Sequence, residues 1–237
     1  MTHYDMVKEI LVLQQRLNDA TNGEGWEKGY NKFGRIINWK RCIYMECAEL
    51  IDSFNWKHWK DINAKEPDWE NVKIEIVDIW HFIASLGLEY YKNQKLGTID
   101  DLAQFIAESK YFTLFCEEPY SVETKNHLAQ MEIINYAEEV MRDALNREDK
   151  NFYKLIDDAI ILSLHCGVNI EVLYKFYIAK NVLNQFRQDH GYKEGTYQKV
   201  INGVEDNTLM LNIMDAKGAM TPDELYKELE KAYKNRK

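Results

Sequence analysis

Residues 73–86, KIEIVDIWHFIASL, decide the fold of this chain. Nearly every position is apolar, yet Glu75, Asp78, His81 and Ser85 recur at spacings of three and four residues. On an α-helix such residues share one stripe, and a helix that is apolar on its other sides is normally buried. Carboxylates in that setting must be neutralised, paired or bound to a metal, because an isolated buried charge is costly.

A second acid pair, Glu46 and Glu49, lies in YMECAELIDSF at 44–54 and has the same spacing of three residues. One such pair is more often a solvated helix face than a site. Its coincidence with the acids of 73–86 favours a metal site built by two facing helices. Four carboxylates suit a hard divalent cation, Mg²⁺ or Mn²⁺ in its place, better than zinc or copper. The expected metal ligands are Glu46, Glu49, Glu75 and Asp78.

The rest of the chain has apolar residues at helical spacing and no strand pattern. With only three prolines and eleven glycines in 237 residues, we expect an all-α, multi-helix bundle. We expect a main helical domain from 1–91 and 151–237, with a smaller inserted helical subdomain at 92–150. The predicted helices cover 3–20, the two acid segments, about 99–116, 122–146, 150–166, 169–189 and a final pair after a loop or short hairpin that reaches residue 206. Asp68, Thr98 or Asp100, and Thr221 are the expected helix caps.

Charge and leader signals limit the classes of function. A net charge of −9 argues against a protein that binds nucleic-acid backbones, although a small nucleotide carrying its own Mg²⁺ is compatible with it. The four cysteines have no CxxC spacing and read as reduced core thiols. There is neither a basic leader followed by an apolar run nor an 18-residue apolar stretch. We therefore expect a cytoplasmic protein with no membrane partner.

Two further groups suggest a ligand. Lys180, Asn184 and Arg187 fall on one helix face, and Tyr192, Lys193 and Lys199 follow in a glycine-punctuated loop. Each alone is more often a solvated residue, but together they offer an Arg fork and point charges for a polyphosphate. Gln14 and Asn18 are four residues apart, so their amides can face the same way and match the alternating donor and acceptor edge of uracil. Ordinary surface amides are the alternative. Trp56, Trp59 and Phe82 offer stacking walls, although such aromatics are more often core residues.

Four ordered motifs carry a resemblance to a known family: LQQRLN (13–18), YMECAELIDSFNWKHWK (44–60), EIVDIWHF (75–82) and KNVLNQFRQDHGYK (180–193). Together they resemble the dimeric all-α dUTPases. The resemblance implies Mg²⁺-dependent hydrolysis of dUTP, and of dUDP, to dUMP with release of pyrophosphate or phosphate, by a homodimer. One departure is that the wider group often has a doubled acid, EExxE, where Met45 precedes Glu46 here.

The resemblance also implies a role for each residue. Glu46, Glu49, Glu75 and Asp78 would hold the metal, and Glu49 would also orient the attacking water as the catalytic base. Gln14 and Asn18 would bind uracil, with Trp56, His81 and Phe82 near the base and sugar, and Phe82 would exclude a ribose 2′-hydroxyl. The phosphate ligands would be Lys180, Asn184, Arg187, Tyr192, Lys193 and Lys199, the last reaching across the dimer.

Three alternatives stay open from the sequence. One is a related all-α pyrophosphohydrolase acting on dCTP or another non-standard nucleotide. Another is a di-iron carboxylate bundle, suggested by the step from Asp78 to His81, although that fold needs two acid-x-x-His motifs. The last is a non-catalytic helical interaction module in which the acids are salt-bridge partners of Lys180 and Arg187.

Overall fold

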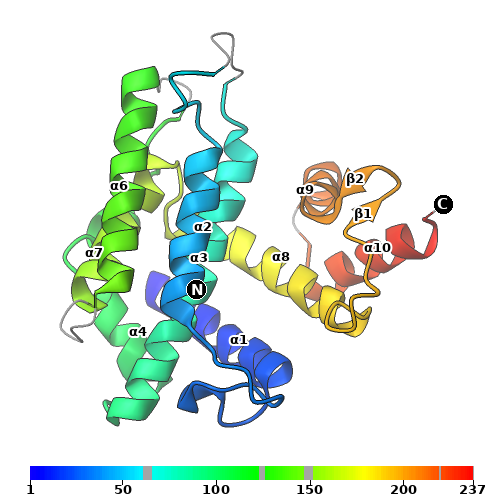
Figure 1. Ribbon diagram of the computed structural model, residues 1–237, viewed down its shortest axis with the longest axis horizontal. Helices are drawn as coiled ribbons and strands as arrows, with labels where there is room; N and C mark the ends of the chain where they lie inside the picture. Colours follow the sequence, from blue (N-terminus) through cyan, green and yellow to red (C-terminus); the bar gives the residue numbers. More distant parts are fainter. Residues whose placement is uncertain (61–65, 123–125, 147–151, 219, 237) are drawn as a thin grey trace. The chain divides into compact units, whose positions relative to one another are not determined.

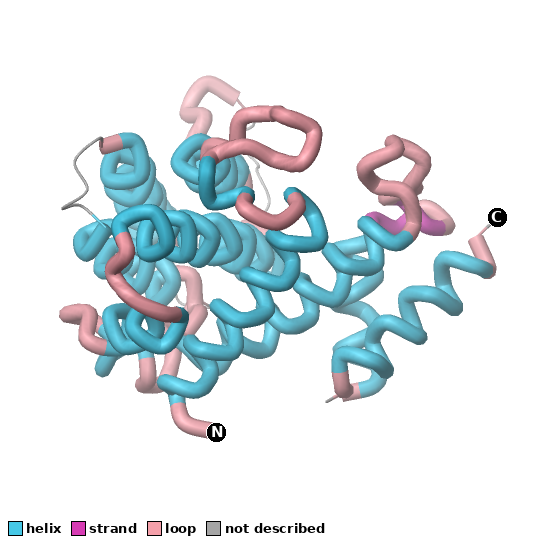
Figure 2. Tube along the Cα trace, turned by 90° about the horizontal axis from the view of Figure 1, so that it is seen from below, coloured by secondary structure: helices cyan, strands magenta, loops and turns pink. Residues whose placement is uncertain are grey.

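The computed structural model describes residues 1–60, 66–122, 126–146, 152–218 and 220–236. Nearly all regular structure in these ranges is helical (Figure 2), which confirms the all-α prediction. The helices are α1 His3–Asn22, η1 Trp26–Lys28, α2 Trp39–Asp52, α3 Trp69–Gln94, α4 Ile99–Ala107, α5 Phe112–Phe115, α6 His127–Leu145, α7 Phe152–His165, α8 Ile170–Asp189, α9 Asp206–Lys217 and α10 Pro222–Lys234. The strands of the described ranges are β1 Val200–Ile201 and β2 Val204–Glu205.

Local capping explains where many of these helices begin. The side chains of Asp68 and Thr98 accept hydrogen bonds from backbone amides in the first turns of α3 and α4, as the sequence predicts. Thr221 and Glu224 form a reciprocal capping box at the start of α10, with Pro222 in the first turn. Such caps satisfy backbone donors that a helix leaves without an internal partner.

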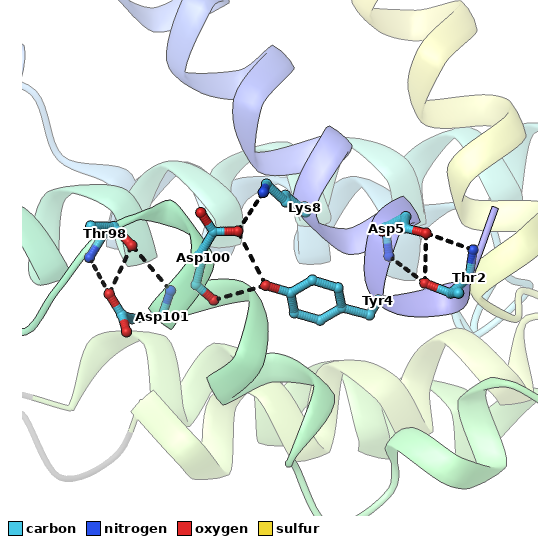
Figure 3. A network of polar contacts seen from close by, with 7 residues as sticks. All are labelled: Thr2, Tyr4, Asp5, Lys8, Thr98, Asp100 and Asp101. Carbon is cyan, nitrogen blue, oxygen red and sulfur yellow. Dashed lines mark hydrogen bonds and ion pairs between the residues drawn. The ribbon is translucent and has the colours of Figure 1, made fainter.

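Figure 3 shows two helix caps beside a contact between helices. Thr2 with Asp5 caps α1, and Thr98 with Asp101 caps α4. Between them, the Tyr4 hydroxyl donates to Asp100 Oδ1 at 3.2 Å, and Lys8 Nζ lies 2.5 Å from the same carboxylate. Asp100 is exposed and Lys8 is partly exposed, so solvent screens the ion pair, and the network mainly fixes how α1 meets α4.

The predicted helix over 99–116 is interrupted. It ends at Ala107, and the short helix α5 resumes at Phe112. Within the gap, the backbone amide of Lys110 donates to Asp157 Oδ1 of α7 at 3.0 Å. A backbone donor committed to another helix cannot continue its own, which explains the break. The helix expected from 122 begins at His127, whereas the start expected at 150 lies outside the described residues.

The chain packs as two units, Met1–Tyr174 and Lys175–Lys237. In the first unit, α2 packs against α3 and α6, α6 packs against α7, and α1 packs against α3 and α4 (Figure 1). Apolar residues on opposite sides of α3, such as Ile74, Ile76 and Ile79, are buried, as the sequence predicts. The packing boundary after Tyr174 differs from the boundaries expected at 92 and 150, and the independence of 92–150 stays a prediction.

The second unit has an aromatic core. Tyr197 stacks on Tyr233 with ring centroids 5.2 Å apart, and the buried Phe186 contacts both rings edge-on. β1 and β2 form an antiparallel hairpin whose two-residue turn, Asn202–Gly203, has positive φ at both positions. This is the turn geometry that asparagine and glycine favour in a hairpin.

Considering the described residues, each helix by itself is too short or too polar to cross a membrane; only α7 and α8, joined at a sharp bend, reach the required length and apolarity together.

Candidate metal and nucleotide site

Three carboxylates meet at the seam between α2 and α3. Glu46 of α2 and Glu75 and Asp78 of α3 each offer an oxygen atom, and these atoms lie within 4.8 Å of one another. All three side chains are half-buried. Oxygen ligands stand about 2.0–2.6 Å from Mg²⁺ or Ca²⁺, so one hard cation can bridge oxygens at this spacing. The structure thus brings together three of the four acids named from the sequence.

Glu49 lies one turn further along α2 and is exposed to solvent. It lines an open hollow of about 600 Å³ together with Asp52, Asp68, Asn71 and Glu75. In that hollow, the Asn71 amide donates to Glu75 Oε1 at 3.2 Å and so helps to orient this carboxylate. Glu49 is outside the group of three but shares the hollow with one of its members. Its service as fourth ligand and as base stays a prediction.

Trp56 lies near the same hollow, after the end of α2. Its indole N–H donates to Asp52 Oδ1 at 3.4 Å, and Lys57 Nζ lies 2.5 Å from the same oxygen. About a third of the Trp56 surface is exposed, and Trp59 packs edge-on against it at 5.6 Å. Its contact with a base stays a prediction.

The two amides predicted to read uracil are buried and bonded to each other. Gln14 Nε2 donates to Asn18 Oδ1 at 3.0 Å and to Ser85 Oγ at 2.9 Å. Asn18 Nδ2 also donates to Ser85 Oγ, and Gln14 Oε1 lies 2.7 Å from His81 Nδ1. The network therefore joins α1 to the polar stripe of α3. Sequence reasoning placed Ser85 on that stripe but missed that it is the point where both amides meet.

Phe82 joins this region to the start of α2. Its ring stacks on Trp39 with centroids 6.0 Å apart, and Trp26 meets Trp39 edge-on at 5.5 Å. Trp39 is not among the site residues predicted from the sequence. The available signal was its spacing, since Trp39 precedes Glu46 by seven residues and so lies on the same face of α2.

The predicted phosphate ligands fall in the second unit, and each of the three on α8 is hydrogen-bonded to another side chain of that unit. Arg187 forms a bidentate ion pair with Asp206, with Nε–Oδ2 and Nη2–Oδ1 distances of 2.8 Å. Lys180 Nζ donates to Asn207 Oδ1 at 3.0 Å, and Asn184 Oδ1 accepts from Arg187 Nη1 at 3.2 Å. Burial opposes ionisation of Asp206, but the Arg187 guanidinium and the Tyr197 hydroxyl hold the pKa of this carboxyl below its usual value.

The remaining phosphate candidates lie in the loop after α8. Tyr192, Lys193 and Lys199 are exposed, and Lys199 Nζ lies over the Tyr192 ring at 5.9 Å from its centroid. Gly191 begins this loop with a φ of +86°, where a Cβ atom would collide with Thr196. The loop thus presents two exposed cations, in contrast to the buried pair on α8. Phosphate binding by all six residues stays a prediction.

A family model described as dUTPase matches residues 6–192. The chain belongs to the dUTPase family. The match spans the amides of α1, both acid segments and the basic segment as far as Tyr192, whereas 193–237 lies outside it. A search of curated proteins finds no match.

As a dUTPase, the protein is a hydrolase that acts on the acid anhydride bonds of dUTP. This confirms the family and the class of enzyme expected from the sequence motifs. It rules out the two alternatives of a non-catalytic interaction module and a di-iron carboxylate bundle. Enzymes of this family use a divalent metal, and the Glu46, Glu75 and Asp78 group is the candidate centre for it.

Proposed function

We propose that this dUTPase hydrolyses dUTP and dUDP to dUMP in a Mg²⁺-dependent reaction, releasing pyrophosphate or phosphate. The observation that carries the proposal is the convergence of Glu46, Glu75 and Asp78 from two helices. Three hard oxygen donors fit Mg²⁺ or Mn²⁺, and they would be poor ligands for a soft metal. A bound cation would neutralise the polyphosphate and polarise the phosphorus under attack.

Glu49 is the proposed catalytic base and fourth metal ligand. It is exposed on a hollow that it shares with Glu75, where water can enter. A carboxylate within one hydrogen bond of the attacking water can take its proton as the new bond to phosphorus forms. Glu49 would therefore orient and deprotonate water, while the three clustered acids hold the metal.

Recognition of the nucleoside is assigned to the amides of α1 and to their neighbours on α3. The bonds to Ser85 and His81 fix the orientation of Gln14 and Asn18, which lowers the entropic cost of binding uracil. Phe82 would reject a ribose by its bulk near the 2′ carbon, and Trp56 would lie against the base. The proposed phosphate contacts come from Lys180, Asn184, Arg187, Tyr192, Lys193 and Lys199.

We also propose a homodimer, in which Lys199 of one protomer reaches the phosphates bound by its partner. The mass in solution, measured by light scattering, tests the dimer separately from the reaction. A variant Lys199→Ala that binds phosphate as the wild type does would remove this residue from the site.

The reaction is tested by following pyrophosphate release from dUTP, UTP, dTTP and dCTP, each with and without Mg²⁺. We expect turnover of dUTP to exceed that of dCTP by at least about 100-fold, because a site that hydrogen-bonds the uracil edge leaves buried groups unpaired with cytosine. UTP has the same base, so its turnover tests the rejection of the ribose by Phe82, and dTTP has the same base edge with an additional methyl group. Removal of Mg²⁺ with a chelator should abolish turnover. Equal or faster turnover of dCTP would overturn the assignment of Gln14 and Asn18 to uracil.

A further inference from the structure

We propose that the indole N–H of Trp39 donates a hydrogen bond to an oxygen atom of the substrate's nucleoside. This inference deepens the proposed function and rests on it. It assigns a specificity-determining residue that the motifs of the chain did not indicate.

The first observation is a buried donor. Trp39 is only 7% exposed, and its Nε1 atom has no hydrogen-bond partner within the described parts of the chain. Roughly nine in ten buried polar groups do have a partner, and a buried tryptophan N–H usually finds one. The other large indole in contact with it follows that rule, because Trp26 Nε1 donates to Asp19 Oδ1 at 3.0 Å. Trp39 is the exception that needs an explanation.

The second observation is the position of Trp39 on the seam between α2 and α3. Trp39 contacts Phe82, and Glu46 meets Asp78, so the two pairs are successive levels of one helix–helix contact. Seven residues of α-helix separate Trp39 from Glu46, which is about 10.5 Å along the axis. A nucleotide whose phosphates bind at the acids and whose body follows the seam therefore passes Trp39.

The chemistry of the donor limits the ligand atom. An indole offers one N–H and no acceptor, so its partner must be an acceptor such as a base carbonyl or a sugar hydroxyl. Phe82, which stacks on the Trp39 ring, is the residue proposed to lie against the sugar, and His81 next to it bonds to Gln14. Both a carbonyl of uracil and a hydroxyl of deoxyribose fit this description.

A competing explanation is that the N–H points at the face of the Trp26 ring, which is nearly perpendicular to the Trp39 ring at 86°. The two explanations differ in what the N–H stabilises. A contact with Trp26 stabilises the free protein, whereas a donor reserved for the ligand contributes nothing until the nucleotide binds. Removing a buried donor that has no partner in the free protein costs folding no hydrogen bond, so Trp39→Phe should lose only the packing of the larger ring.

The test uses Trp39→Phe, which keeps a ring against Phe82 and removes the N–H, with Trp26→Phe as the matched control. Thermal unfolding is measured for both variants without ligand, and dissociation constants are measured by calorimetry for dUMP and for pyrophosphate. We expect Trp39→Phe to lower the melting temperature less than Trp26→Phe does, because both lose ring packing but only Trp26→Phe also loses a hydrogen bond, to Asp19. We expect Trp39→Phe to bind dUMP about five- to tenfold more weakly, with pyrophosphate binding unchanged. Trp26→Phe should show the larger drop in melting temperature and leave dUMP binding unchanged.

A dUMP affinity within twofold of the wild type in Trp39→Phe, or a melting temperature lowered as in Trp26→Phe, overturns the donor role. A nucleotide without the 3′-hydroxyl separates the two acceptors: if it binds wild type and Trp39→Phe equally, the acceptor is the sugar, and if the difference persists, the acceptor is the base. If the wild type hydrolyses dUTP and Trp39→Phe binds dUMP as tightly as the wild type, the donor role of Trp39 is refuted and the proposed function stands. If the wild type does not hydrolyse dUTP, both the proposed function and the donor role of Trp39 are refuted.

Discussion

The α2–α3 seam of the first unit and the α8–α9 segment of the second differ in how they arrange charges. The seam gathers charges of one sign, and the segment pairs charges of opposite sign. At the seam, Glu46, Glu75 and Asp78 bring three carboxylates within 4.8 Å of one another. In the second unit, Arg187 and Lys180 are each bonded to a complementary oxygen of the adjacent residues Asp206 and Asn207. Like charges gathered by a fold oppose folding and point to a ligand, whereas complementary buried charges hold the fold together.

The strongest test of this contrast removes a seam carboxylate. Asp78→Asn should lower kcat for dUTP by about 1,000-fold or more, because a catalytic metal contributes several kcal/mol to the transition state. The variant should stay folded without metal, because asparagine keeps the shape of the aspartate side chain. Initial rates at saturating Mg²⁺, together with thermal unfolding without metal, measure both effects.

Two neighbouring acids make the result specific. Asp52→Asn changes an exposed acid that lines the same hollow but is ion-paired to Lys57, and it should keep near-normal turnover. Glu49→Gln should lose turnover while still binding Mn²⁺, as followed by electron paramagnetic resonance, because it removes the proposed base and leaves the three clustered ligands. Near-normal activity of Asp78→Asn would contradict the assignment of Glu46, Glu75 and Asp78 as the metal site.

The next largest effect concerns the second unit. Arg187→Met leaves the Asp206 carboxylate buried without its guanidinium partner and should lower the free energy of unfolding of 175–237 by about 3 kcal/mol. All six tryptophans lie between residues 26 and 80, so their fluorescence follows the first unit alone. Far-UV circular dichroism should therefore show an earlier transition that tryptophan fluorescence does not.

The double variant Arg187→Met, Asp206→Leu separates structure from phosphate binding. It should recover most of the lost stability, because both charges are removed together. If Arg187 also binds phosphate, as proposed, turnover of the double variant should still be at least about tenfold below the wild type. Full turnover in the stabilised double variant would make Arg187 a purely structural partner.

The same contrast explains what could be predicted from the sequence. The acid stripe and the helix caps depend on spacings of three or four residues, and Asp68, Thr98 and Thr221 were therefore predictable as caps. Asp206, the partner of Arg187, lies 19 residues further along the chain, after a hairpin. The spacing of residues along one helix therefore could not predict this ion pair. The break after Ala107 likewise depends on a contact with Asp157 of another helix. Local periodicity determines which faces are polar, and tertiary packing determines what meets them.

The smallest expected effect comes from an acid that belongs to neither group. Burial raises the pKa of Glu89 on α3 to about 7, with Glu27 adding to the rise and Lys40 opposing it. An unfolded glutamate titrates near pH 4.3, so between that pH and about 7 the folded state holds more protons than the unfolded state. Stability contributed by this group is therefore lost as the pH rises through that window.

Glu89→Gln removes this titration, and its advantage over the wild type should grow from pH 5 to pH 8. Because the side chain is only partly buried, solvent screening limits the gain at pH 8 to about 1 kcal/mol. Melting temperatures at the two pH values measure it, with the exposed Glu24→Gln as the control that should show no such difference. A variant that is less stable than the wild type at pH 8 would mean that the ionised Glu89 gains more from Lys40 than burial costs it. Glu89 would then resemble the paired charges of the second unit.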